Sequence, residues 1–126
     1  MAAEATLYTV LTGWVPLTLL VGTDIYVGTW DQGASFPLVV AIRLPGGEKV
    51  QAVTAAVLGR LVPFQIEAVA ETESEARDVA DQIEAALAAS APASFADVVF
   101  GNDHYFHEPD AKLHRYLVEV SVLEAA

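Results

Sequence analysis

The side chains best suited to chemistry gather in one short segment near the C-terminus. Residues 103–110 read Asp-His-Tyr-Phe-His-Glu-Pro-Asp, and His114 follows four residues later. Imidazole and carboxylate groups are the ligands that bind zinc and redox metals in proteins. His104 and His107 are three residues apart, a spacing that brings two side chains together on a helix but fixes no geometry in a loop. A small metal-dependent enzyme that uses these two histidines is therefore one hypothesis for the chain.

The flanks of this segment favour a structural interpretation. Pro109 and the turn-forming residues around it predict a hairpin connection, in which the histidines are solvated. His114 shares a predicted strand face with Tyr116 and Val118, so we expect it to be partly buried at the edge of the core. We predict no metal ligand, no catalytic residue and no cofactor here.

No other catalytic pattern is present in the sequence. The chain has no cysteine, which excludes disulfides, a thiolate nucleophile and a cysteine-based zinc site. It has no Gly-x-Ser-x-Gly nucleophile motif. The run Pro45-Gly46-Gly47-Glu48-Lys49 lacks the Gly-Lys-Ser/Thr ending of a phosphate-binding loop. The sequence therefore predicts a protein that is not an enzyme.

The composition indicates self-association. Hydrophobic residues make up 54% of the 126 residues, against about 45–50% in an average domain. Because a domain of this size has much surface for its volume, it cannot easily bury so many apolar side chains in its own core. Seventeen acidic residues against six basic ones give a net charge of −11. This excess of acidic residues argues against nucleic-acid binding, which requires a basic surface.

The N-terminal region carries no pattern of a membrane or targeting segment. Residues 7–22 are apolar, but Gly13 and Pro16 interrupt them and the run is shorter than the ~20 residues of a membrane span. The start Met-Ala-Ala-Glu lacks the basic residues of a secretory signal. We expect no membrane partner.

Periodicity predicts a single α+β domain over residues 1–126. Apolar residues at helical spacing predict a helix over 3–12, and Pro16 opens a second short turn through Leu20. The capping pattern Thr72-x-x-Glu75 starts a long amphipathic helix, which we expect to end at residues 90–92. Strands are predicted over residues 23–27, 38–44, 58–71, 96–100 and 113–123. They form a mainly antiparallel sheet with the helices packed against it.

Two of these strands carry more specific expectations. The run 38–44 is continuously apolar, as in a strand buried on both faces. In the strand 58–71, Val62, Phe64 and Ile66 alternate with more polar neighbours, and Pro63 requires a sheet edge or a bulge because it has no N–H.

The segment between these strands is a candidate subunit contact. Residues 46–57 carry no strong period, and a loop of this length inside a domain usually serves a function. We expect it to order on a neighbouring subunit, and the turn-rich segment 28–37 presents aromatic residues nearby in sequence. The predicted interface residues are Trp30, Glu48, Lys49, Val50, Gln51, Val53 and Val57.

The acidic residues concentrate on the predicted long helix. Its outer face carries Glu73, Glu75, Asp78, Asp81 and Glu84. Such a run is usually a solvated face, and a docking stripe is the alternative. Glu67 and Glu119 lie on strands and are expected to pair with Arg60 or Arg115.

Motifs in the first half of the chain resemble a known family. Leu-Val-Gly-Thr-Asp-Ile-Tyr at 20–26 and Gln-Gly-Ala-Ser-Phe-Pro-Leu-Val-Val at 32–40 are similar to "LVG-x-R-I-Y" and "P-Q-G-A-x-x-P-Y-V-V". Those motifs open the small tail-completion, or tail-terminator, proteins of long-tailed bacteriophages and phage-like particles. The chain departs from them at Asp24, at Trp30-Asp31 and at Leu38.

Two later motifs extend the resemblance over residues 7–123. Residues 68–77, Ala-Val-Ala-Glu-Thr-Glu-Ser-Glu-Ala-Arg, resemble the family's "V-x-A-x-T-x-x-E-A-R". Residues 108–116 resemble its "Y-E-P-x-T-x-L-Y-R" turn, with His107 in place of the tyrosine. Family-motif positions expected to be structural are Tyr26, Gly33, Pro37 and Arg115.

The resemblance implies a structural virion protein. By resemblance to the members of this family, the chain is expected to form a hexameric ring at the head-proximal end of the tail. Such a ring caps the tail tube and joins it to the head connector, and DNA passes through its lumen. It implies a homo-oligomer with tube and connector proteins as partners, located in the virion neck and assembled in the host cytoplasm. Another neck ring protein, a stopper or an adaptor, is the alternative within the virion.

Overall fold

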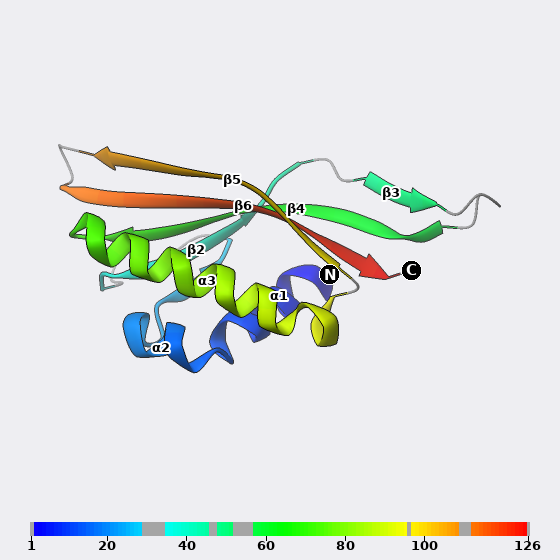
Figure 1. The fold of residues 1–126 in the computed structure, drawn as a ribbon, viewed down its shortest axis with the longest axis horizontal. Coiled ribbons are helices and arrows are strands. Elements are labelled where there is room, and N and C mark those ends of the chain that lie inside the picture. The colour runs from blue at the N-terminus through cyan, green and yellow to red at the C-terminus, as the bar shows by residue number, and fades with distance from the viewer. Residues whose placement is uncertain are drawn as a thin grey trace.

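The fold is a twisted sheet with helices packed on one of its faces (Figure 1). In the computed structural model, residues 2–28, 35–45, 48–51, 57–95, 97–108 and 112–125 are described. Their elements are α1 (Ala2–Thr12), α2 (Val15–Val21), β1 (Ile25–Val27), β2 (Leu38–Arg43), β3 (Glu48–Gln51), β4 (Val57–Ala70), α3 (Glu73–Ser94), β5 (Asp97–Glu108) and β6 (Leu113–Ala125). The strand order is β1-β2-β4-β6-β5, and β3 pairs with β4. Only the β1–β2 pair is parallel among these strands, so the predicted α+β class is confirmed.

The two N-terminal helices form where the sequence predicts them. Pro16 lies in the first turn of α2, where its missing N–H has no partner to lose. Trp14 caps the start of α2, and its indole N–H donates to the Gln82 side-chain oxygen at 3.0 Å, which ties this corner to α3. Within the described part of the chain, no single helix is long and apolar enough to span a membrane. Helices α1 and α2 reach that length and composition only when they are taken together, and the chain bends by 81° between them.

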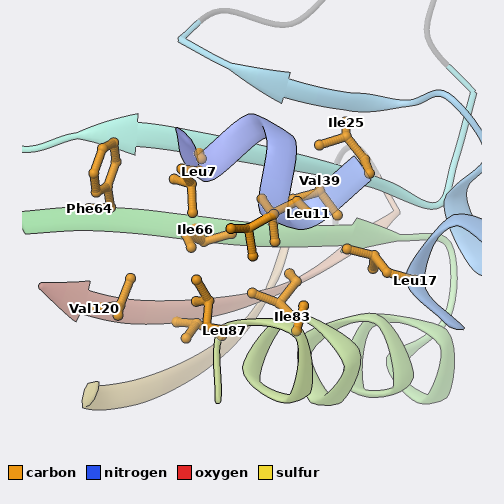
Figure 2. Close-up of a cluster of buried hydrophobic side chains, with 14 of the residues drawn as sticks. Leu7, Leu11, Leu17, Ile25, Val39, Phe64, Ile66, Ile83, Leu87 and Val120 are labelled. Atoms are coloured by element: carbon orange, nitrogen blue, oxygen red, sulfur yellow. The ribbon is translucent and has the colours of Figure 1, made fainter. Parts of the chain in front are cut away.

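The main core lies between the helices and the sheet (Figure 2). Alternate residues of β4, including Phe64 and Ile66, face the helices and are fully buried. Ile83 from α3 and Leu11 from α1 pack over them. On the opposite face of the sheet, a second cluster joins Leu38, Val40 and Val69. The prediction that the run 38–44 is buried on both faces is therefore confirmed for residues 38–41, whereas Ile42 and Arg43 are exposed.

Pro63 lies at a break in the strand pairing along β4. On that edge, β2 pairs with residues 64–69 and β3 with residues 57–61, so Pro63 belongs to neither register. Its carbonyl accepts a hydrogen bond from the Leu44 N–H at 2.9 Å. The β4–β6 register runs past Pro63 without a shift, so there is no bulge at this position. Of the two predicted alternatives, the unpaired edge of the strand is the one that accommodates the missing N–H of Pro63.

The structure corrects three sequence-based boundaries. Residues 48–51 are strand β3, not loop, because the long β4 offers them an unpaired edge. Strand β5 continues to Glu108 through a bulge between Phe100 and Asp103, so the histidine segment is a strand and not the hairpin connection. Helix α3 runs through Pro92 to Ser94. Proline fixes a φ angle that helices tolerate, and near the helix end it sacrifices only one hydrogen bond.

Candidate functional site

The β3–β4 hairpin reaches beyond the helices at one end of the molecule (Figure 1). Four of the predicted interface residues form β3 itself, Glu48, Lys49, Val50 and Gln51, and Val57 opens β4. The register pairs Gln51 with Val57 at the tip and Glu48 with Leu61 at the base. Trp30 and Val53 of the predicted interface, and Gly33 of the family motif, lie outside the described residues. The hairpin is thus a projecting element built from the predicted contact segment.

Two basic residues lie directly opposite each other on this hairpin. Lys49 is the cross-strand partner of Arg60, and Arg60 in turn lies beside Glu124 of β6. Arg60 is exposed and has the same parity as Val62, so it lies on the sheet face that carries the helices farther along. Among the described side chains, no carboxylate forms an ion pair with Arg60. The register therefore places two basic residues side by side on the hairpin, and one of them, Arg60, is exposed.

At the opposite end, a groove of about 340 Å³ separates α2 from α3. Its walls are Pro16, Leu19 and Leu20 on one side and Asp78, Asp81 and Gln82 on the other. Leu19 is 80% exposed and Leu20 is 40% exposed, so the α2 wall of the groove is an exposed apolar patch. No sequence pattern predicted this groove. The one sequence feature that could have indicated it is the composition of α2. Val15–Val21 is apolar apart from Thr18, so part of its apolar surface must remain uncovered.

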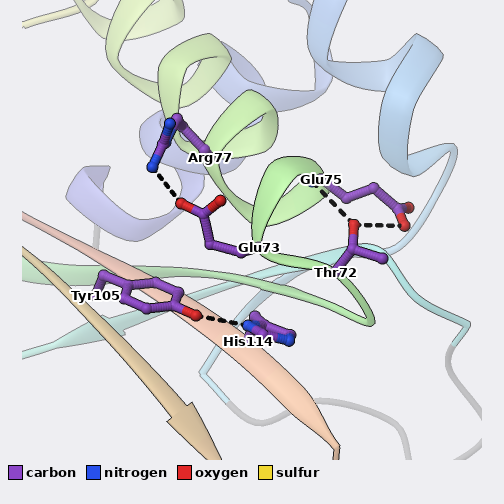
Figure 3. A network of polar contacts seen from close by, with 6 residues as sticks. All are labelled: Thr72, Glu73, Glu75, Arg77, Tyr105 and His114. Carbon is purple, nitrogen blue, oxygen red and sulfur yellow. Dashed lines mark hydrogen bonds and ion pairs between the residues drawn. The ribbon is translucent and has the colours of Figure 1, made fainter.

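The acidic face of α3 is partly solvated and partly held to its neighbours (Figure 3). Thr72 caps the helix as predicted: its hydroxyl accepts the Glu75 N–H at 3.2 Å and donates to the Glu75 carboxylate at 3.1 Å. Arg77 pairs with Glu73, one turn away. Glu75, Asp78 and Asp81 are exposed, which agrees with a solvated face.

Glu84 behaves differently from the rest of this face. Burial raises the pKa of Glu84 from 4.5 to about 7, assisted by a hydrogen bond to Asp103 and by the charges of Asp103 and Asp81. Near neutral pH a protonated Glu84 carboxyl can therefore donate a hydrogen bond to Asp103, which links α3 to the edge strand β5.

The structure separates His104 from His107. Their partners in the β5–β6 register are Leu117 and His114, so the two imidazoles project from opposite faces of the strand. His104 Nε2 lies 3.6 Å from a Glu119 carboxylate oxygen, where the sequence predicted an arginine partner for Glu119. The described residues contain no group of three or more histidines and carboxylates placed to hold a metal ion.

His107 and His114 instead join an aromatic cluster. Their rings stack with centroids 4.2 Å apart, and the Tyr105 hydroxyl lies 2.6 Å from His114 Nδ1 (Figure 3). Tyr105 also packs on Tyr116. His114 is half-buried, as predicted for a residue at the core edge. The cluster fastens the far ends of β5 and β6 together.

The described family-motif residues have structural contacts. The Tyr26 hydroxyl donates to an Asp24 carboxylate oxygen at 2.8 Å, so the departure at position 24 anchors the motif tyrosine. Pro37 follows a cis peptide bond with Phe36 and precedes β2. Arg115 pairs with Glu67, as the sequence analysis allowed.

Comparisons with known proteins agree with this geometry. The family model described as "Tail completion protein gp17" matches residues 5–125, and no curated protein matches significantly. Solved structures with the same fold include a chain of the "Virion of native gene transfer agent (GTA) particle". That chain is 18% identical with a TM-score of 0.77, over 99% of this chain and 96% of its own length. The resemblance seen in the sequence motifs is therefore confirmed, and the chain belongs to the tail completion protein gp17 family of structural phage tail proteins.

Proposed function

We propose that this chain forms a homo-oligomeric ring of six copies that caps the tail tube and joins it to the head connector. The observation that carries the proposal is the family match over residues 5–125. The shape supports it, because the projecting hairpin and the exposed groove lie at opposite ends of the subunit (Figure 1). Contacts between two different surfaces run head to tail, and they close into a ring when the rotation allows.

The proposed partners are a tail tube protein on one ring face and a connector protein on the other. The ring would be located in the virion neck, at the head-proximal end of the tail, after assembly in the host cytoplasm. Its action is structural and involves no catalysis. The divergence of His104 and His107 supports this, because a pair of ligands must converge on one ion.

DNA would pass through the lumen without specific binding. Six copies carry a charge of −66, six times the −11 of one chain. Repulsion between acidic walls and phosphates would let the duplex slide. A basic lumen in a structure of the assembled ring would contradict this part of the proposal.

The test measures the mass of the purified protein alone and with tube protein. The expected result is a ring-sized particle, either free or at the tube end, that stops tube growth. Binding to connector protein without any effect on tubes would instead indicate a stopper or an adaptor. Stoichiometric zinc or manganese in the purified protein would favour the metal-dependent enzyme.

Deletion of residues 46–56 tests the role of the hairpin. It removes β3, which pairs only with the projecting part of β4 among the described strands. We expect a folded monomer that neither forms rings nor terminates tails. Normal assembly of this variant would show that the hairpin is not the subunit contact.

A further inference from the structure

The groove between α2 and α3 is an apolar surface without a partner among the described residues. Leu19 is 80% exposed and Leu20 is 40% exposed, and both line the groove together with Pro16. Val15, one turn before Leu19, is 62% exposed. A cluster of exposed apolar side chains of this kind marks an interaction site in a soluble protein.

The opposite wall of the groove is acidic. Asp78 and Asp81 lie one helical turn apart on α3 and line the groove with Gln82. Both are exposed, and neither pairs with a basic residue among the described side chains. An occupant that matches this groove must offer positive charge to one wall and aliphatic surface to the other.

The chain has few basic residues that could serve. Of its six, Arg43, Arg77 and Arg115 already pair with Glu4, Glu73 and Glu67. Lys49 and Arg60 lie directly opposite each other on the projecting hairpin. Like charges directly opposite each other across two strands are destabilising, and Arg60 forms no ion pair with Glu124 or any other described carboxylate of its own subunit.

The positions of the hairpin and the groove determine which subunits they can join. The hairpin and helix α2, which forms one wall of the groove, lie toward opposite ends of the long axis of the molecule (Figure 1). A hairpin therefore cannot reach the groove of its own subunit, but it can reach that of a neighbour.

We infer that the groove between α2 and α3 receives the β3–β4 hairpin of a second copy of this chain. The two basic positions of the hairpin, Lys49 and Arg60, supply the positive charge that Asp78 and Asp81 of the neighbour require, and the aliphatic stem of the exposed Arg60 covers Leu19. The inference rests on the proposed ring and assigns its repeating contact. It also divides the acidic face of α3, because these two carboxylates then belong to the subunit interface and not to the lumen.

Charge reversal in two matched variants tests this contact. The hairpin variant carries Lys49→Glu and Arg60→Glu, and the groove variant carries Asp78→Lys and Asp81→Lys. Each variant alone places like charges in every contact, so we expect assembly to weaken by about 100-fold or more. In an equimolar mixture every contact again joins opposite charges, because the subunits alternate. The mixture should recover rings with an even number of subunits.

The assay is native mass spectrometry and tube termination, for each variant and for the mixture, at low and high salt. Lys112→Glu is the charge control, because this exposed residue lies between β5 and β6 and belongs neither to the groove lining nor to the hairpin. Leu19→Ser tests the apolar wall and should weaken assembly without lowering the melting temperature. Circular dichroism confirms that each variant is folded.

The outcomes separate this inference from the function on which it rests. If wild-type protein forms rings and the hairpin variant does so equally well, the contact is wrong while the ring stands. The same conclusion follows if both variants fail and the mixture also fails. If wild-type protein neither self-associates nor stops tube growth, both the ring and its contact are wrong.

Discussion

Arg115 donates a hydrogen bond to the Glu67 carboxylate over 3.0 Å, and the two side chains are only 17% and 12% exposed. Glu67 lies on the sheet face opposite the helices, between the inward-facing Ile66 and Ala68. Gln65 donates a longer hydrogen bond of 3.4 Å to the other carboxylate oxygen. The second face of the sheet therefore contains a buried charge pair beside its small apolar cluster.

Removal of one member of this pair should be strongly destabilising. Arg115→Met leaves the Glu67 carboxylate buried without its partner, and we expect the free energy of unfolding to fall by about 3 kcal/mol. Urea unfolding measures the change. The double variant Glu67→Gln, Arg115→Met should lose less than the sum of the two single variants, because no isolated charge remains.

Arg77→Met is the matched control for this pair. The Arg77–Glu73 contact is 57% and 36% exposed at its two side chains, so its loss should leave the urea midpoint nearly unchanged. Strictly additive effects at Glu67 and Arg115 would show that the two residues are not coupled.

Glu84 should make stability depend on pH. Because its pKa is raised from 4.5 to about 7, chiefly by burial, the folded protein keeps a proton between these values that the unfolded chain has lost. The contribution of Glu84 to the free energy of unfolding is therefore largest below pH 4.5 and falls as pH rises through 7. Glu84→Gln should flatten this decline and be more stable than wild type at pH 8. Urea midpoints between pH 5 and pH 8 measure it.

Glu71→Gln serves as the comparison for Glu84, since Glu71 is an exposed carboxylate just before α3. This variant should follow the wild-type pH profile. Parallel profiles for wild type and Glu84→Gln would contradict the raised pKa of Glu84.

Gly59 should be required for the base of the hairpin. A Cβ at this position would lie 2.4 Å from the Glu124 carbonyl oxygen, so the β4 and β6 backbones would have to separate. We expect Gly59→Ala to destabilise this end of the sheet by about 1–3 kcal/mol and to weaken assembly. Faster amide hydrogen exchange near Gly59 and Glu124 would report the local opening.

Gly101→Ala provides a graded comparison for Gly59. There the nearest atom to an added Cβ is a side-chain carbon of Glu119 at 3.1 Å, which can move by a few tenths of an ångström. A larger effect at Gly101 than at Gly59 would contradict the close approach of the two backbones.

Ile83 should be essential for folding. It is fully buried between α3 and the sheet (Figure 2). Ile83→Asp places an unpaired charge in the core, and the penalty is comparable with the whole stability of about 5–15 kcal/mol that a domain has. Circular dichroism should show an unfolded chain. Ala88→Asp, on the exposed side of the same helix, should fold normally.

Local patterns in the sequence were sufficient for most of the fold. Helical spacing located α1 and the start of α3, and the Thr72–Glu75 capping pair forms as predicted. Alternation located β4 and β6, and the apolar run that starts at Leu38 identified residues 38–41 of β2 as buried on both faces. These features are predictable because each residue's burial depends on the period of its own element. The family motifs, which are also local, led to the same family as the match over residues 5–125.

Tertiary structure alone decided the parts that depend on partners far apart in the chain. Strand β3 pairs along the edge of β4, and the extension of β5 through His104 and His107 pairs along the edge of β6. Both segments are polar, so their sequences show no alternation of apolar and polar residues that would have predicted a strand. The groove joins Leu19 to Asp81 across 62 residues, and the partner of Glu67 was one of two arginines until β4 and β6 were in register. A sequence states which residues avoid water, but only the register and the packing determine which of them meet.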